Sequence, residues 1–151
     1  VKVTRGEEQA LRLIAAMARA ESQITLTELS IAENMAEPTI AKLMGKLRTA
    51  GIVKAVRGRK GGYILNRDPS EIYMSEVMRS LGRPLLEGID CTPENPRDDE
   101  CPHNSDCGLR SVMNRLESYM AAVLEKVSIE DMMMPEPVVD LQVKKMTDSN
   151  E

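Results

Sequence analysis

Residues 25–65 have the sequence TLTELSIAENMAEPTIAKLMGKLRTAGIVKAVRGRKGGYIL, which predicts two short helices followed by a β-hairpin. Thr25 and Thr27 are both candidate N-caps. Glu28, three residues after Thr25, would complete a capping box with it, and the first helix is expected to end near Asn34. Pro38 suits the first turn of a second helix, whose apolar positions repeat at helical spacing: Ile40, Leu43, Met44 and Leu47. Gly51 then supplies the residue without a side chain that a helix C-terminus favours. Two short helices joined by a tight turn indicate a helix-turn-helix, in which the second helix is the recognition helix.

Two short strands are expected after the recognition helix, over residues 52–56 and 63–65, joined by Arg57-Gly58-Arg59-Lys60-Gly61-Gly62. The glycines allow positive φ in a hairpin, and the cations would meet a phosphate backbone or a narrow minor groove. A basic, glycine-rich loop can also cradle a nucleotide, but this one opens no helix, which excludes a P-loop. With a helix over residues 4–20 in front of it, the pattern predicts a winged helix-turn-helix domain over residues 1–82.

Charge is divided unevenly along the chain. Residues 1–68 carry 12 basic and 7 acidic side chains, whereas residues 69–151 carry 8 and 17. A basic half of this kind predicts double-stranded DNA as the partner. Lys42 and Lys46, four residues apart, are expected to face the major groove. The candidate DNA-binding residues are Thr39, Lys42, Lys46, Arg48, Arg57, Arg59 and Lys60.

Composition excludes several classes of protein. The core must be aliphatic, because the chain has no Phe or Trp and has 11 Met. An apolar run long enough to cross a membrane does not occur, and three cysteines do not suit a secreted disulfide framework. We therefore expect a soluble protein of the bacterial cytoplasm with no membrane partner. An enzyme with a catalytic thiol is disfavoured, because the single His103 has no evident orienting partner.

The second half predicts a short helix, a loop and a long helix. We expect a helix over 72–81, with Ser75 as a possible cap and Gly82 at its end, and a loop over 83–108. A long helix and a further capped turn follow over 109–134, and 135–151 is expected to be a tail. The apolar face of the long helix comprises Leu109, Val112, Met113, Leu116, Met120, Val123, Leu124 and Val127. This face could pack on its own domain, but a two-fold operator favours pairing with a second subunit.

Three cysteines lie within the loop that leads into this helix, spaced as Cys91-x9-Cys101-x5-Cys107. Thiolates are soft ligands that suit iron–sulfur clusters or zinc. A zinc site of the three cysteines plus His103 is the main alternative, although structural zinc sites more often use paired C-x2-C motifs. Inert thiols and a redox disulfide between Cys101 and Cys107 are further alternatives.

Several of these motifs together resemble one family. They are Lys2-Val3-Thr4 with Ala10-Leu11, the segment Leu43-x3-Leu47-Arg48-x2-Gly51, the wing from Val56 to Leu65, and the cysteine loop before a long helix. Over about residues 2–133 the chain resembles the IscR/NsrR/RirA family of bacterial winged-helix iron–sulfur transcriptional regulators. The resemblance implies a homodimeric regulator, commonly a repressor, in which a [2Fe-2S] or [4Fe-4S] cluster controls affinity for a palindromic operator and senses redox, nitric oxide or iron status.

The resemblance also implies roles for individual residues. The cluster cysteines correspond to Cys91, Cys101 and Cys107, with a longer first gap than is common. The His that ligates the cluster in one branch is replaced by Arg110, whereas the acidic ligand that another branch takes from the partner subunit corresponds to Glu8. We therefore expect Glu8 as the fourth ligand, with His103 as the second choice.

On the DNA side, the wing arginine of the family corresponds to Arg57. The glutamate of the family's recognition helix corresponds to Ala41, and its usual polar cap to Ala36, so the operator preference is expected to differ. A branch without clusters regulates cysteine metabolism, and the three cysteines argue against membership in that branch.

Overall fold

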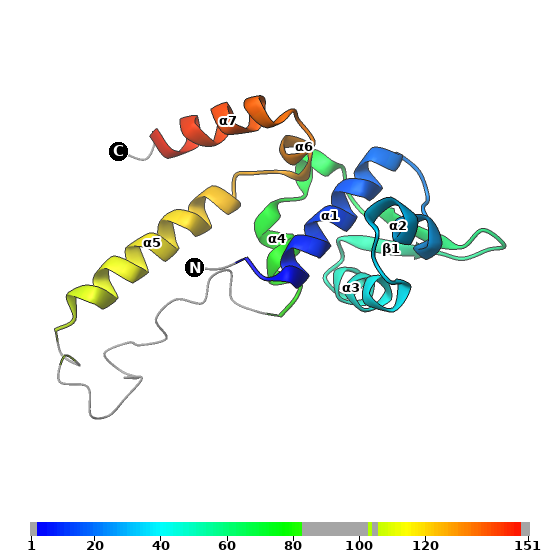
Figure 1. The fold of residues 1–151 in the computed structure, drawn as a ribbon, viewed down its shortest axis with the longest axis horizontal. Coiled ribbons are helices and arrows are strands. Elements are labelled where there is room, and N and C mark those ends of the chain that lie inside the picture. Colours follow the sequence, from blue (N-terminus) through cyan, green and yellow to red (C-terminus); the bar gives the residue numbers. More distant parts are fainter. Residues whose placement is uncertain (1–2, 83–102, 104–105, 149–151) are drawn as a thin grey trace.

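The computed structural model describes residues 3–82, 103 and 106–148. Their fold is mostly helical with one two-stranded antiparallel hairpin (Figure 1), which confirms the expected fold class. The elements in chain order are α1 (Arg5–Ala20), α2 (Leu26–Glu33), α3 (Glu37–Thr49), β1 (Val53–Val56), β2 (Gly62–Leu65), the 3-10 helix η1 (Pro69–Glu71), α4 (Met74–Arg79), α5 (Gly108–Leu124), α6 (Ile129–Met132) and α7 (Glu136–Asp148).

Helix α1 lies at the centre of the domain, and α2, α3, α4 and α6 pack around it (Figure 1). It begins at Thr4, where Glu7 completes a capping box, and its apolar side chains are buried over nearly three turns. The core joins this helix to α2, α3, the hairpin and α4 through fully buried side chains that include Leu13, Ile14, Leu29, Ile40, Met44, Leu47, Ile52, Val77 and Met78. Burial of one apolar face per helix supplies the main stabilisation of this small domain.

The hairpin is anchored to the domain by a third extended segment. β1 and β2 pair in the register Val53↔Leu65 to Val56↔Gly62, and Ile24 forms a bridge with Tyr63 on the other side of β2. The Tyr63 N–H donates to the Ile24 carbonyl at 2.8 Å, and the Ile24 N–H donates back at 3.0 Å. A Cβ at Gly62 would lie only 2.5 Å from the Ile24 carbonyl oxygen, so this close pairing requires glycine.

The short helix before residue 82 differs from the sequence-based expectation. α4 begins at Met74 with Tyr73 as its N-cap, and Ser75 is buried inside the helix rather than capping it. The reason is tertiary, because residues 72–74 pair with residues 127–129, and Ile72 and Tyr73 are extended before the helix starts. The Ile129 N–H donates to the Ile72 carbonyl at 2.8 Å, and the Met74 N–H to the Val127 carbonyl at 2.9 Å. α4 ends at Arg79, earlier than expected, and Gly82, which we expected directly after the helix, has φ +77°.

The C-terminal part differs from expectation in two places. α5 ends at Leu124, and Val127 is a 4% exposed residue of the following loop rather than part of the helical face. Ser128 caps α6 through Asp131, which confirms the predicted capping box. Residues 136–148, expected to be a tail, instead form α7, which packs on α5. Pro137 in its first turn is compatible with a helix start, because the missing N–H would be unpaired there.

Candidate nucleic-acid interface

The turn between α2 and α3 is held by local hydrogen bonds, and this sets the orientation of α3. Thr25 caps α2 in the predicted capping box, with Glu28 Oε2 accepting from the Thr25 backbone N–H at 2.8 Å. Asn34 ends α2 with φ +51°, in the left-handed region that asparagine tolerates. The Ser30 hydroxyl donates to the Met35 carbonyl at 2.6 Å. The two helices are therefore joined as a defined helix-turn-helix rather than by a free loop.

The recognition helix has one buried and one exposed face. Ile40, Met44 and Leu47 are fully buried and Leu43 nearly so, whereas Lys42 and Arg48 are exposed and Thr39 is half-buried. At the start of the helix, the Thr27 hydroxyl of α2 donates to Glu37 Oε1 at 2.7 Å. The exposed face of α3 therefore carries cations, as a surface that enters a DNA groove requires.

Lys46 is exposed, as expected, but it also has a partner within the domain. Its Nζ donates to the backbone carbonyl of Leu81, just beyond α4, at 3.0 Å. The side chain that we expected to face the groove beside Lys42 is thus engaged within the domain. In the part of the chain that the structure describes, Lys42 itself makes no hydrogen bond or ion pair and remains available to DNA.

The hairpin projects from the helical body as a wing (Figure 1). Arg57, Arg59 and Lys60 at its tip are all exposed, as expected from the sequence. Gly58 has φ +138°, which L side chains rarely adopt, and its carbonyl accepts from the Gly61 N–H at 3.0 Å. The turn therefore presents three cations on a backbone that glycine makes possible.

The positive charge of the wing also affects the pKa of Glu28 at the start of α2. The pKa of Glu28 is lowered, first by its hydrogen bonds from Thr25 and additionally by the positive charge of Lys60. This carboxylate is therefore ionised under physiological conditions and stays bound to its own helix cap.

Of the proposed sensor residues, the structure describes Cys107 and His103. Cys107 is the N-cap of α5, a half-buried free thiol whose Sγ accepts from the Arg110 N–H at 3.4 Å. His103 is exposed, and Cys91 and Cys101 lie outside the described residues. Within residues 3–82, 103 and 106–148, no three potential metal ligands come together.

Glu8 is exposed on α1 and takes part in an ionic chain that reaches the helix-turn-helix. Its Oε1 lies 3.6 Å from Arg12 Nη1. Arg12 in turn donates from Nε to Glu33 Oε2 at 3.0 Å and from Nη2 to the Glu33 carbonyl at 2.8 Å. Glu33 is the last residue of α2, so Arg12 connects the candidate oxygen ligand with the turn before the recognition helix.

Comparison with known proteins settles the family. Residues 3–135 match the family model described as "Rrf2: Iron-dependent Transcriptional regulator". The chain belongs to the Rrf2 family of transcriptional regulators. Its helix-turn-helix and hairpin are accordingly the winged-helix, DNA-binding part of an Rrf2 protein.

Similar Rrf2 proteins include regulators named IscR and the cysteine regulator CymR. The transcriptional regulator IscR of Photorhabdus laumondii is 27% identical over 128 residues, which cover 85% of this chain and 75% of that protein. The structure of IscR from T. potens is similar with a TM-score of 0.67 and 26% identity, covering 88% of this chain and 86% of the other. The structure of CymR, the global cysteine regulator of B. subtilis, is similar with a TM-score of 0.68 and 26% identity, covering 88% and 96%. These relatives are named regulators of transcription, which points to a role other than catalysis.

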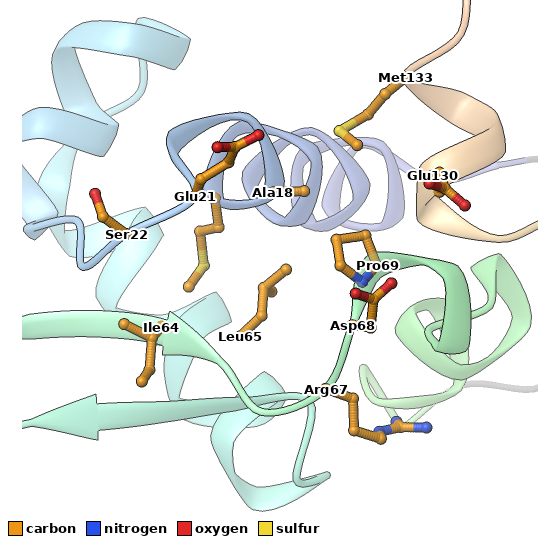
Figure 2. Close-up of a pocket in the computed structure, with 11 residues that line it drawn as sticks. Ala18, Glu21, Ser22, Ile64, Leu65, Arg67, Asp68, Pro69, Glu130 and Met133 are labelled. Carbon is orange, nitrogen blue, oxygen red and sulfur yellow. The ribbon is translucent and has the colours of Figure 1, made fainter.

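A pocket of about 690 Å³ lies between the end of α1, β2 with the loop after it, and α6 of this Rrf2 chain (Figure 2). Met17, Leu65 and Met133 supply apolar walls. Two of its charged residues are engaged elsewhere, since Arg67 binds Glu76 at 2.6 Å and Asp68 accepts from the Ser70 hydroxyl at 2.6 Å. We therefore assign no ligand to this pocket.

Sequence reasoning missed three contacts that join elements of the Rrf2 domain: Lys46 with Leu81, Thr27 with Glu37, and Arg12 with Glu33. Each links polar side chains or carbonyls from different segments of the fold, and the sequence carries no periodic signal for such pairs. None of the described helices has the length and apolar composition to cross a bilayer.

Proposed function

We propose that the protein is a cytoplasmic, dimeric, DNA-binding regulator whose operator affinity depends on an iron–sulfur cluster held by Cys91, Cys101 and Cys107. Three soft thiolates fit an iron–sulfur cluster, and the one that the structure describes has suitable surroundings. Cys107 is a free thiol at the N-terminus of α5, where unpaired amides favour negative charge. A bound cluster would supply redox and nitric-oxide chemistry, and its occupancy would respond to iron supply. The similarity to IscR supports this choice.

The DNA-binding step uses two surfaces of the winged helix. α3 would enter the major groove with Thr39, Lys42 and Arg48, and Arg57, Arg59 and Lys60 of the wing would contact the flanking backbone. The observation that carries this proposal is the division of α3, whose apolar face is buried while Lys42 and Arg48 are exposed. Stabilisation of the core requires only the buried face of α3. It does not require the cations on the outer face of this helix or those on the adjoining hairpin.

Pairing of two chains would occur through α5. Leu109, Val112 and Leu116 are 62, 58 and 49% exposed, and their spacing of three and four residues places them on one face. An apolar stripe of this kind is unfavourable in water, and a second copy would cover it. Two winged helices related by a two-fold axis then match a palindromic operator.

Communication between the two sites would use the first helix. Glu8, contributed by the partner subunit, is the proposed oxygen ligand. Because Glu8 also pairs with Arg12, binding to the cluster would compete with this ion pair. Release of Arg12 would change the support of Glu33 at the end of α2. A tenfold change in DNA occupancy requires only about 1.4 kcal/mol of differential binding, which rearrangement of one ligated loop can supply.

The direct test is purification without air, followed by an absorption spectrum, iron and acid-labile sulfide analysis, and operator binding before and after exposure to oxidant. We expect iron and sulfide, their loss in Cys107→Ser, and binding that changes with cluster state. His103→Ala is the matched control and should keep the cluster if Glu8 is the fourth ligand. Absence of iron and sulfide, together with binding identical in every redox state, would refute cluster sensing.

A second candidate is a winged-helix regulator that uses zinc or thiol oxidation without a cluster. The similarity to CymR, named a global cysteine regulator, and the free thiol of Cys107 favour it. It predicts a colourless protein. Zinc by elemental analysis would indicate the zinc form, and a Cys101–Cys107 disulfide after oxidation would indicate the thiol form.

A further inference from the structure

The hydrogen bond from Lys46 to Leu81 joins the recognition helix to the end of α4 across 35 residues of sequence. In the described part of the chain it is the one side-chain hydrogen bond between α3 and residues 74–82. It is a charge-assisted bond to a carbonyl just beyond the C-terminus of α4, where the helix dipole favours a cation. The bond is therefore stabilised by its position as well as by its partner.

The acceptor end of this bond is fixed in the core. Leu81 is 8% exposed, and its Cδ1 lies 3.9 Å from the position of a Cβ at Gly6, in the first turn of α1. A groove of about 610 Å³ runs between α3 and residues 79–82, and Lys46 spans it. Lys46 thus joins the recognition helix to a backbone position that is buried against the first turn of α1.

Lys42 and Lys46 line the same groove one helical turn apart, but only Lys46 has a partner within the domain. One of the three N–H donors of the exposed Lys46 ammonium is committed to the Leu81 carbonyl, which directs the side chain toward residues 79–82. We propose that Lys46 is a positioning residue, which holds the recognition helix against the end of α4 and does not contact DNA. This inference rests on the proposed DNA-binding function and assigns different roles to two lysines that the sequence treats as equivalent.

The acceptor of this bond also lies next to the proposed sensor segment. Gly82 is followed directly by the segment that contains Cys91 and Cys101, which lies outside the described residues. The bond therefore joins the recognition helix to the point where the chain enters the proposed sensor segment. A shift of residues 81–82 would reach α3 through Lys46 without passing through the wing.

The test compares Lys46→Met with Lys42→Met. Because the operator sequence is not established, a duplex is first selected by the wild-type protein from a random pool, and affinity is then measured against salt for this duplex and an unrelated one. Removal of a lysine that contacts DNA phosphate reduces the magnitude of the slope of log K against log salt by about 0.9. We expect this decrease in Lys42→Met. Lys46→Met should keep the wild-type slope and unrelated-duplex affinity, but lose roughly threefold to tenfold on the selected duplex.

Two further variants make the outcome decisive. Lys46→Arg keeps a donor and should restore selected-duplex affinity, while the Tm of each variant excludes a general loss of fold. Gly82→Ala has open space around it but an unfavourable φ of +77°, so it should displace the Leu81 carbonyl and lower selectivity as Lys46→Met does. In the double variant the two losses should not add.

Three results would overturn the inference: a salt slope reduced by about one in Lys46→Met, unchanged selectivity in that variant, or additive losses with Gly82→Ala. Failure of the wild-type protein to select any duplex would instead refute the proposed function itself. The two failures are therefore distinguishable.

Discussion

Arg12 of α1 holds Glu33 at the end of α2 by both its carboxylate and its backbone carbonyl, at 3.0 and 2.8 Å. The Glu33 side chain is only 14% exposed, so the contact is better shielded from solvent than an ordinary surface ion pair. Because the backbone carbonyl of a helix terminus is one of the two acceptors, the contact fixes the end of α2 and hence the turn before α3. The guanidinium of Arg12 therefore helps to orient the helix-turn-helix from the side of α1.

We predict that Arg12→Ala lowers the free energy of unfolding by about 1 kcal/mol, a value reduced for the partial exposure of Arg12. Arg12→Lys should recover only part of this loss, since an ammonium lacks the planar fork that reaches two acceptors. Urea unfolding measures both effects. Arg19→Ala, at an exposed position of the same helix, is the control and should be nearly neutral. Equal stability of Arg12→Ala and Arg19→Ala would contradict this role.

Gly62→Ala should displace the wing. The added Cβ would lie 2.5 Å from the Ile24 carbonyl oxygen, so the bridge between Ile24 and Tyr63 must open, at a cost of about 1–3 kcal/mol. Thermal unfolding and DNA affinity should both decrease. Gly45→Ala is the stability control, because it has open space in a helix and should raise stability by about 0.5–1 kcal/mol. A Gly62→Ala protein with wild-type Tm would show that the bridge does not restrict this position.

Substitutions of Val127 and Val112 should have different effects, the first on stability and the second on oligomeric state. Val127→Ala removes buried methyl groups and should destabilise the chain by about 1–3 kcal/mol without changing its oligomeric state. Val112→Asp should leave the fold intact but convert dimers to monomers, as measured by sedimentation. Asn114→Asp on the same helix adds the same charge at another exposed position and should stay dimeric. A Val112→Asp dimer of wild-type affinity would exclude this face as the interface.

Acid should destabilise the domain through Glu28 and Asp68. Hydrogen bonds from Thr25 and from Ser70 lower the pKa of these two carboxyls below their values in the unfolded chain. The stabilisation is therefore complete above the unfolded pKa, about 4, and is lost as pH falls through the lower folded pKa. Unfolding by urea between pH 7 and pH 3 should show a smaller decrease for Glu28→Gln and Asp68→Asn. An undiminished acid dependence in the double variant would contradict this assignment.

Local signals along the chain were sufficient for most elements of the DNA-binding domain. The capping boxes at Thr25 and Ser128, the apolar face of α3 and the left-handed Gly51 at its end all occur as expected. Each depends on residues within a few positions of one another, so the sequence pattern contains the whole cause. The cysteines at positions 91 and 101 lie outside the described residues, and their role stays a prediction.

Ser75 shows where local reasoning failed. Its residue type suits a helix cap, but the start of α4 depends on the pairing of Ile72 with Ile129, which are 57 positions apart in the sequence. Val127 follows the same logic, because α5 ends before it and its carbonyl accepts from the Met74 N–H at the start of α4. The pairing between these two distant segments thus sets both where α5 ends and where α4 begins.

The amino-acid sequence by itself determined the winged helix-turn-helix, because capping, periodicity and turn chemistry act between near neighbours. It also placed the cations on α3 and the wing. Only the tertiary structure separated Lys42 from Lys46, since the Leu81 carbonyl reaches one ammonium and not the other. The physical reason is that a hydrogen bond between distant segments depends on how helices pack, and identical side chains one turn apart then meet different surroundings.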